Sequence, residues 1–265
     1  MRILILGGMG MLGHKLYQVL SKKFDTYVTM RHKESEHRKF NIFNEKKVYF
    51  QISCDNLEAV EKVIKKNKPD VIINCIGIVK QIIDESNYID TIYVNAIFPH
   101  KLKNICKENQ IRLIHFSTDC VFSGKSRLYK ESDMIDVNDV YGLSKYLGEL
   151  NSEGCLTIRT SIIGRELCSS NGLLEWFMSN KGGNVKGYKN VIFSGLPTIV
   201  LSKIIMDILE NFEKLSGLYH VSSKPINKYK LLKMINSQFS LDISIEPQSD
   251  YIMDRSLDSS LFQSS

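Results

Sequence analysis

The chain opens with the stretch Met1-Arg2-Ile3-Leu4-Ile5-Leu6-Gly7-Gly8-Met9-Gly10-Met11-Leu12-Gly13, in which a short apolar run passes directly into a glycine-rich turn. The apolar run has the length of a buried strand, and a helical apolar period starts at Met11. At such a junction, glycines allow a tight turn, a close backbone approach to pyrophosphate and close packing of helix on strand. The positive end of the helix dipole also favours phosphate. We therefore predict a dinucleotide site formed by Gly7, Gly10, Met11, Leu12 and Gly13, with a plain glycine turn as the alternative.

Downstream of this turn, apolar runs of strand length alternate with stretches of helical period, which is typical of a parallel sheet with helices on both faces. The expected strands cover residues 2–6, 26–30, 48–52, 71–75, 112–117, 156–161 and 218–221. The expected helices cover residues 11–22, 57–67, 94–108, 141–150, 173–180, 199–212 and 228–238. The pattern predicts an α/β fold, a Rossmann-type doubly wound parallel sheet.

Glycines become frequent after Ser161, which indicates a change of organisation there. We expect an NAD(P)-binding domain over residues 1–161 and a small irregular substrate lobe over most of residues 162–265. The strand near 218–221 is expected to return to the sheet. The lobe should close over the carboxyl ends of the strands, where open parallel sheets bind ligands.

Composition narrows the functional classes. The 265 residues are 43% hydrophobic and 24% charged, values of a globular chain rather than a disordered or fibrous one. No apolar run reaches the roughly 18 to 20 residues of a membrane span, so we expect a cytoplasmic protein that is neither spanning nor secreted. The net charge of +6 is spread in mixed runs, with one local excess over residues 31–39, which argues against nucleic-acid binding.

Neither the cysteines nor the histidines show the spacing of a metal site. The six cysteines contain no CxxC pair and are expected to be core thiols, and the six histidines contain no HxxxH pair. We therefore expect no metal.

The end of the second expected strand bears on the choice of nicotinamide cofactor. An acidic residue at this position binds the adenosine ribose, whereas an arginine accepts a 2′-phosphate. Arg31 follows the strand and no carboxylate appears before Glu34, so NADPH is favoured while NADH remains possible. The alternative is that Arg31 belongs to a solvated surface turn.

The catalytic candidates are Tyr141 and Lys145, in a YxxxK stretch that opens an expected helix, and Thr118 at the end of an expected strand. Residues four apart share one helix face, so the Lys145 ammonium is expected to bias the Tyr141 phenol towards its ionised form. A tyrosine tuned in this way exchanges a proton with a carbonyl/alcohol pair. Thr118 would bond the substrate oxygen, and Lys145 would also hold the nicotinamide ribose. The alternative is a chance Tyr/Lys pair on an exposed helix.

With these motifs in view, the sequence resembles the extended short-chain dehydrogenases/reductases, and among them the dTDP-4-dehydrorhamnose reductase branch. The resemblance covers essentially the whole chain and is carried by residues 7–13, 74–77, 94–96, 115–124, 129–131, 141–149, 158–161 and 195–198. The stretches Ser117-Thr118-Asp119-Cys120-Val121-Phe122-Ser123-Gly124 and Gly195-Leu196-Pro197-Thr198 are specific to the branch. The resemblance implies an NADPH-dependent reductase of a nucleotide-linked 4-keto-6-deoxysugar, in surface polysaccharide precursor biosynthesis.

The resemblance also implies further contacts. It adds Cys75, Ile76, Gly77 and Asn95 to Tyr141 and Lys145 on the cofactor, and it places Asp119, Cys120, Ile162 and Trp176 near the substrate. From the residues themselves, we favour packing over base stacking for Trp176 and Phe177, and a loop-fixing role over an acid role for Asp119 and Glu131.

The chain departs from the family at several positions. Cys120 replaces a usual tyrosine, Ile162 a frequent tryptophan, and Ser53 an acidic residue. The first two positions lie near the sugar in the family, so the sugar or the base is expected to differ. The chain also ends at Ser265, where the family usually continues into a final helix.

Two alternatives to a reductase stay open. One is a nucleotide-sugar epimerase of the same superfamily. A dehydratase is disfavoured because it needs an Asp-Glu pair in place of Thr118-Asp119, and that pair is absent. The other is a non-catalytic regulatory subunit like that of methionine adenosyltransferase, against which Thr118, Tyr141 and Lys145 argue. The expected partner is the nucleotide sugar, and a homodimer is the candidate assembly.

The segment 164–198 is expected to bind the nucleotide half of the substrate. It contains Lys181, Lys186 and Lys189 without an acid between them, and a diphosphate needs positive charge. The alternative is that these lysines only solubilise a loop.

Overall fold

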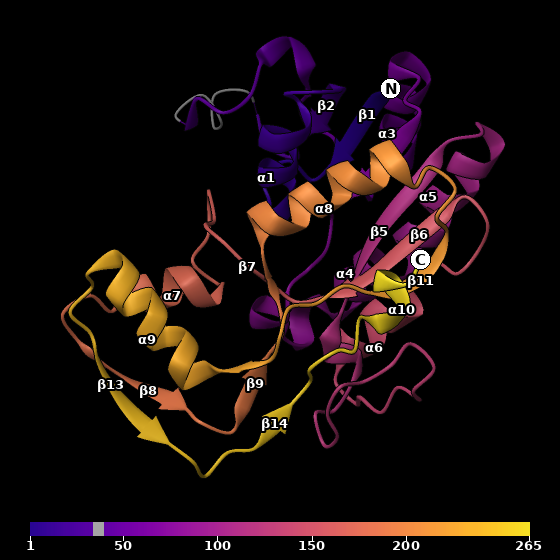
Figure 1. Cartoon of the computed structure of the whole chain (residues 1–265). Helices are drawn as coiled ribbons and strands as arrows, with labels where there is room; N and C mark the ends of the chain where they lie inside the picture. The colour runs from indigo at the N-terminus through magenta and orange to yellow at the C-terminus, as the bar shows by residue number, and fades with distance from the viewer. Residues whose placement is uncertain (34–39) are drawn as a thin grey trace.

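Seven parallel strands form the central sheet of the computed structural model, which describes residues 1–33 and 40–265 (Figure 1). The spatial order is β11-β6-β5-β4-β1-β2-β3. The strands are β1 (Arg2–Leu6), β2 (Asp25–Thr29), β3 (Val48–Tyr49), β4 (Val71–Asn74), β5 (Arg112–Thr118), β6 (Cys155–Thr160) and β11 (Gly217–His220). All seven expected strands are present, so the predicted Rossmann-type fold is confirmed. The order changes direction between β1 and β4, and ligands of such sheets bind at this switch point, beyond the carboxyl ends.

Helices cover both faces of the sheet, and each face has its own apolar core. The helices are α1 (Met11–Leu20), α3 (Leu57–Asn67), α4 (Tyr88–Ile92), α5 (Phe98–Glu108), α6 (Val140–Leu147) and α8 (Thr198–Asn211). Leu16 of α1 and Ile205 of α8 belong to the core on one face, and Ile64 of α3 and Leu102 of α5 to the core on the other. Burial on both faces explains why the strands read as continuous apolar runs.

Two helix predictions need correction. The helix expected over 94–108 begins with a π-helical turn, η5 (Tyr93–Ile97), and becomes α-helical only as α5. The short helix α4 was not expected at all. Ile89, in its first turn, is 84% exposed, so α4 lacks the apolar periodicity of a buried face.

The polypeptide after residue 161 is shared between the sheet and a separate lobe, seen below and to the left of the sheet in Figure 1. The lobe consists of α7 (Leu173–Ser179), β8 (Asn184–Tyr188), β9 (Val191–Phe193), β12 (Ile226–Asn227), α9 (Lys228–Phe239), β13 (Ser244–Gln248) and β14 (Met253–Asp254). Its own small core includes Phe177, Leu232 and Ile243. By contrast, α8 packs against α1 and β11 pairs with β6.

Three further short elements complete this half. β7 (Ile162–Ile163) pairs with β10 (Leu196–Pro197), and α10 (Ser260–Gln263) packs beside β11. The strands of the lobe escaped prediction because they are short and carry few consecutive apolar residues.

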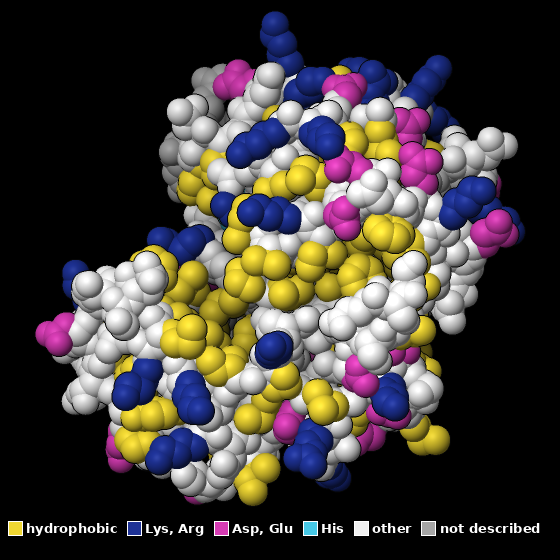
Figure 2. Space-filling model, in the orientation of Figure 1, with side chains coloured by type: hydrophobic (Ala, Val, Ile, Leu, Met, Phe, Trp, Pro, Cys, Tyr) yellow, Lys and Arg dark blue, Asp and Glu magenta, His cyan; other side chains and the backbone are white. Residues whose placement is uncertain are grey.

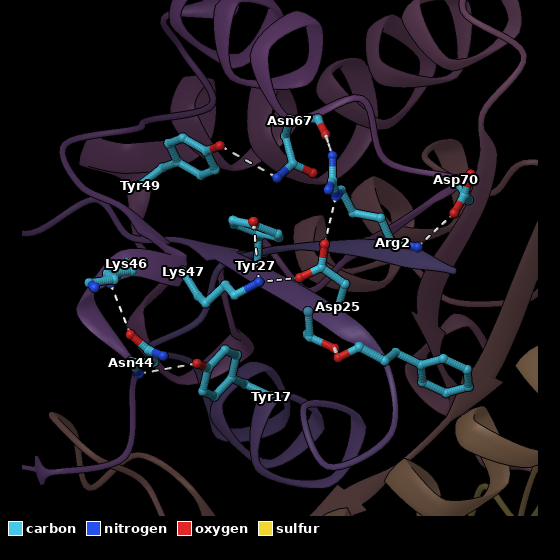
Figure 3. A network of polar contacts seen from close by, with 12 residues as sticks. Arg2, Tyr17, Asp25, Tyr27, Asn44, Lys46, Lys47, Tyr49, Asn67 and Asp70 are labelled. Carbon is cyan, nitrogen blue, oxygen red and sulfur yellow. Dashed lines mark hydrogen bonds and ion pairs between the residues drawn. The ribbon is translucent and has the colours of Figure 1, made fainter.

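The amino-terminal edge of the sheet is held by a polar network centred on Asp25 (Figure 3). Arg2 donates from Nε to Asp25 at 2.8 Å and from Nη1 to the Asn67 carbonyl at 2.8 Å, and Lys47 also pairs with Asp25. The two cations hold the pKa of Asp25 below its usual range, with Lys47 as the larger cause. These charges lie at the edge opposite to the carboxyl ends, so we assign them to the fold.

On the face shown in Figure 2, basic side chains are scattered among acidic and apolar ones and form no continuous stripe. The surface is hollowed between the sheet and the lobe, with apolar side chains around the hollow. In the part of the chain that the structure describes, no helix combines the length and apolarity needed to cross a bilayer.

Candidate functional site

The glycine turn between β1 and α1 has the backbone geometry expected of it. Gly7 has φ of +85°, which only glycine adopts readily, and a Cβ at Gly13 would lie 2.2 Å from the Gly7 carbonyl oxygen. Gly10 is the N-cap of α1 and offers no side-chain cap to the first helical turn. A Cβ at Gly10 would meet only the Gly7 oxygen, at 3.4 Å. The first turn of α1 therefore presents N–H groups on an open cradle that fits a phosphate.

The other residues of the turn contribute in different ways. The Leu12 side chain is 7% exposed and belongs to the core, so only its backbone is free to bind a ligand. Met11 is half-buried, and Gly172 of the lobe lies against its side chain. Glu166 holds this approach by accepting a 2.7 Å hydrogen bond from the Gly172 N–H. The lobe thus reaches the glycine turn.

The end of β4 lies beside the turn, because a Cβ at Gly7 would come within 3.2 Å of the Cys75 carbonyl carbon and the Ile76 nitrogen. Cys75 and Ile76 are half-buried, and Gly77 is exposed. Burial raises the pKa of the Cys75 thiol, which is therefore neutral.

Asn95, expected to contact the cofactor, is instead fully buried behind this loop. Its amide accepts from the Ile78 N–H at 2.9 Å and donates to the Ile78 carbonyl at 3.0 Å. It also donates to the Ser144 hydroxyl at 3.3 Å, so the Asn95 side chain shapes the loop after β4, and its expected contact with the cofactor stays a prediction.

Arg31 lies two residues beyond β2 and is exposed. The end of β2 is bonded to the glycine turn, since the Gly8 N–H donates to the Thr29 carbonyl at 2.9 Å. Arg31 therefore lies near the turn, where a residue that binds the 2′-phosphate of NADPH would have to lie. Glu34, and most of the basic stretch 31–39, lie outside the described residues.

Thr118 and Tyr141 are brought together by the packing of α6 on the turn η6 (Asp119–Val121). A Cβ at Gly142 would lie 2.3 Å from the Cys120 carbonyl oxygen, so only glycine lets the first turn of α6 approach this closely. Thr118 caps η6 by accepting from the Cys120 N–H at 3.1 Å, and Asp139 caps α6 by accepting from the Gly142 N–H at 2.9 Å. Burial raises the pKa of Tyr141, and a side-chain hydrogen bond with Thr118 partly opposes the rise.

Lys145 is held by a contact with β5. Its side chain is buried, and its ammonium donates a 2.7 Å hydrogen bond to the Phe116 carbonyl of β5. Burial lowers the pKa of Lys145 to about 8. Burial is also the largest cause of the raised pKa of Tyr141. Burial rather than Lys145 is thus the main influence on the Tyr141 phenol, and the expected bias towards phenolate stays a prediction.

Two cations that were not predicted face this group. Arg255, just after β14, donates from Nη1 to the Cys120 sulfur at 3.3 Å, while its buried Nε has no partner among the described residues. Lys228, the first residue of α9, interacts with Asp119, and burial lowers the pKa of its ammonium. Burial also raises the pKa of Asp119, which both cations oppose. Two cations and one buried acid leave this side of the site electropositive.

No sequence signal identified Lys228 or Arg255, because lysine and arginine are common and both residues lie more than 80 positions from Tyr141. Only the unusual Cys120 could have drawn attention to the contact with Arg255.

The remaining predicted substrate residues are distributed over the lobe side. Ile162 is half-buried in β7, directly after β6. Trp176 is 42% exposed on α7, whereas Phe177 is fully buried, so Phe177 is a packing residue and the choice between packing and base stacking for Trp176 stays a prediction. Lys181, Lys186 and Lys189 are exposed on and around β8, which pairs with β13 at the far side of the lobe (Figure 1).

Glu131 fixes a loop: it accepts a 2.7 Å hydrogen bond from the His220 N–H of β11. The described cysteines are all free, and no group of three metal-ligating side chains occurs among the described residues.

Comparison with known proteins gives a consistent picture. The family model for the RmlD substrate binding domain matches residues 1–253. A dTDP-4-keto-6-deoxy-D-glucose reductase of Streptomyces niveus is 34% identical over 34% of this chain and 32% of its own length. The matched stretches span 31 to 46% of the first curated relatives.

Two solved structures align over nearly the whole chain. A hypothetical dTDP-4-dehydrorhamnose reductase from Sulfolobus tokodaii has a TM-score of 0.80 at 26% identity, covering 100% of this chain and 94% of the other. The dTDP-4-dehydrorhamnose reductase of Bacillus anthracis, solved in complex with NADP, has a TM-score of 0.80 at 22% identity, covering 99% and 92%.

Proposed function

The chain belongs to the RmlD substrate binding domain family, and from this membership we propose that it is an NADPH-dependent reductase of a nucleotide-linked 4-keto-6-deoxysugar. The observation that carries the proposal is the meeting of Thr118, Tyr141 and Lys145 at the carboxyl edge of the sheet, the same edge that carries the glycine turn. The product would serve the synthesis of surface polysaccharide precursors. In this proposal residues 1–161 hold the cofactor, and the lobe after residue 161 holds most of the substrate.

The residues of the glycine turn fit a dinucleotide. Its pyrophosphate would meet the uncapped N–H groups at the start of α1, over the cradle that Gly10 leaves open. Arg31 would bind the 2′-phosphate, in keeping with the NADP bound by the reductase of Bacillus anthracis. When bound, the reduced nicotinamide supplies the hydride that the keto carbon receives.

Tyr141 would donate the proton that the keto oxygen needs. Its raised pKa keeps the phenol protonated at neutral pH, which is the form required for reduction. Thr118 would hydrogen-bond the same oxygen and orient it towards the phenol. The carbonyl thus becomes an alcohol, with hydride added at carbon and the proton from Tyr141 added at oxygen.

Lys145 would act beside the phenol as a buried cation. Its pKa of about 8 leaves it mainly charged at neutral pH, and its remaining N–H groups are free to bind the nicotinamide ribose. Once Tyr141 has lost its proton, this positive charge would stabilise the phenolate until a proton returns.

Arg255 and Lys228 would hold the anionic part of the substrate. They supply positive charge on the lobe side of Tyr141. A nucleoside diphosphate fits this charge, because phosphate oxygens accept charge-assisted bonds from guanidinium groups. The lysines around β8 lie farther along the lobe, where we propose that the nucleotide is held.

The decisive experiment offers the purified protein dTDP-, UDP-, GDP- and CDP-linked 4-keto-6-deoxysugars with NADPH, and follows the absorbance of the cofactor. We expect oxidation of NADPH with one of these donors and none with Tyr141→Phe. An epimerase would convert the sugar without net consumption of NADPH, and a regulatory subunit would bind NADPH without oxidising it. Either result would overturn the proposal.

A further inference from the structure

Glu149 is a buried carboxylate close to the proposed catalytic group, with no role in the mechanism above. It follows Gly148, the C-cap of α6. A Cβ at Gly148 would lie 1.9 Å from the Asn95 carbonyl oxygen, so α6 ends pressed against η5. The Glu149 side chain is 8% exposed, and a buried carboxylate needs several hydrogen-bond donors.

Three hydrogen bonds supply those donors. Ser117 donates from Oγ to Glu149 at 2.6 Å, and Arg159 of β6 donates from Nε and Nη2, each at 2.7 Å. The Arg159 side chain is itself 4% exposed, so the bidentate pair is shielded from water. Such a pair fixes the direction of the carboxylate.

Glu149 also contacts the end of β5. Lys145 bonds the carbonyl of Phe116, Glu149 bonds the hydroxyl of Ser117, and the next residue is Thr118. Two polar contacts, one from Lys145 of α6 and one from Glu149, therefore hold β5 at the two residues that precede Thr118.

Arg159 is oriented from its other side by His220 of β11. His220 Nδ1 lies 2.9 Å from the Tyr129 carbonyl, which can only accept, so Nδ1 carries the proton. The opposite nitrogen, Nε2, then accepts from Arg159 Nη1 at 3.3 Å. Burial lowers the pKa of His220, which keeps this neutral form.

Among the charged groups around Lys145, Glu149 has the largest effect on the pKa of its ammonium. Burial opposes the charged form of Lys145, and the principal group that opposes this effect is Glu149. The other titratable groups are neutral: burial raises the pKa of Cys75 and Tyr141 and lowers that of His115. Arg159 is occupied by Glu149 itself.

We propose that Glu149 is a positioning residue of the reductase site, whose carboxylate acts on Lys145 and on the end of β5 that carries Thr118. The inference rests on the proposed function, because it assigns Glu149 a role in the chemistry of Tyr141 and Lys145. Glu149 does not reach the substrate. Through Ser117 it holds the end of β5, beside the Lys145 bond to Phe116, so that Thr118 stays in register with Tyr141, and its charge favours the ammonium form of Lys145.

A direct test measures the protonation of Lys145 without any substrate. In protein labelled with ¹³Cε-lysine, the Lys145 signal is identified by its absence in Lys145→Arg and followed against pH. The midpoint in the native protein is expected at about 8. In Glu149→Gln it should fall by about one pH unit, because removal of a nearby opposite charge disfavours the ammonium.

Glu153→Gln is the matched control, since Glu153 is exposed in the loop four residues further on. Its Lys145 midpoint should stay at the native value, and Glu149→Asp should restore most of the shift. If the unpaired Arg159 prevents Glu149→Gln from folding, Glu149→Gln/Arg159→Gln serves as the reference and Arg159→Gln alone as its partner, and the midpoint should be lower in the double variant than in Arg159→Gln. An unchanged midpoint in a folded variant overturns the proposal.

The pH dependence of kcat/KM distinguishes a failure of this inference from a failure of the proposed function. The pH at which kcat/KM falls on the alkaline side should move down together with the Lys145 midpoint in Glu149→Gln. If the native protein oxidises no NADPH while the midpoint still moves, the proposed function fails and the effect of Glu149 on Lys145 stands. If NADPH is oxidised and the alkaline limb does not move, the positioning role fails.

Discussion

The cofactor half and the substrate half of the proposed site are built in opposite ways. The centre of the cofactor half, where the pyrophosphate would bind, lies within seven consecutive residues, from Gly7 to Gly13, and depends on backbone groups and on the absence of side chains. The substrate half depends on side chains: Thr118, Tyr141, Lys228 and Arg255, which more than a hundred residues of chain separate.

This difference determines what each half tolerates. A local turn fails when a Cβ is added, because the clash is with backbone that cannot move away. A group assembled from distant elements fails when one charge or hydroxyl is removed, and the fold remains. The two halves should therefore separate cleanly in binding, stability and turnover measurements.

The largest effect is expected in the substrate half, at Tyr141. Tyr141→Phe keeps the ring and removes the proton, so turnover should fall by about 10² to 10⁴ while NADPH binding stays near normal. Steady-state kinetics and fluorescence titration with NADPH measure the two quantities. Tyr146→Phe, at a residue 39% exposed on the same helix, is the control and should leave both unchanged. Undiminished turnover in Tyr141→Phe would remove the mechanism.

In the cofactor half, adding a methyl group to a glycine of the turn should reduce stability or NADPH binding, depending on the position. Gly13→Ala places a Cβ against the Gly7 carbonyl and should cost about 1 to 3 kcal/mol of unfolding free energy, as overpacking does. Gly10→Ala meets no such clash and should fold normally, yet bind NADPH more weakly because its Cβ enters the cradle. Denaturant unfolding and NADPH titration compare the two. Equal losses of stability would contradict the difference between the positions.

The anion contacts should sharpen the comparison further. Arg255→Met and Lys228→Met should each weaken binding of a nucleoside diphosphate by roughly tenfold or more, since a charged hydrogen bond contributes about 1.5 to 3 kcal/mol. NADPH binding should be unaffected. Lys230→Met, at an exposed position on the same helix, is the control. If calorimetry finds native affinity for the nucleoside diphosphate in both variants, Arg255 and Lys228 do not form the anion site.

The smallest effect is expected at Arg31, an exposed side chain that we propose as a cofactor contact. Arg31→Ala should reduce the preference for NADPH over NADH to near unity, mainly by weakening NADPH, because the alanine cannot bond a 2′-phosphate. Paired titrations with the two cofactors measure the ratio. Equal affinities in the native protein would already contradict the assignment.

Much of the fold followed from local patterns. Strands buried on both faces must be apolar throughout, and α3 shows how its ends are encoded: Asn56 caps its start, and Lys68 leaves it in a left-handed conformation before Pro69. The lobe resisted prediction because β12 and β14 have two residues each and pair only with distant β9. No periodicity can develop over so short a strand.

The sequence by itself determined the parallel sheet, the glycine turn and the candidate trio of Thr118, Tyr141 and Lys145, because each depends on residues close together in the chain. Tertiary structure decided the electrostatics of that trio. The folded chain brings Lys145 into a hydrogen bond with the Phe116 carbonyl, and burial raises the pKa of Tyr141 and lowers that of Lys145, effects that their helical spacing does not reveal. It also decided that Asn95 serves the loop after β4, and that Arg255 reaches Cys120 from 135 residues away. Desolvation and long-range contacts exist only once the chain has folded.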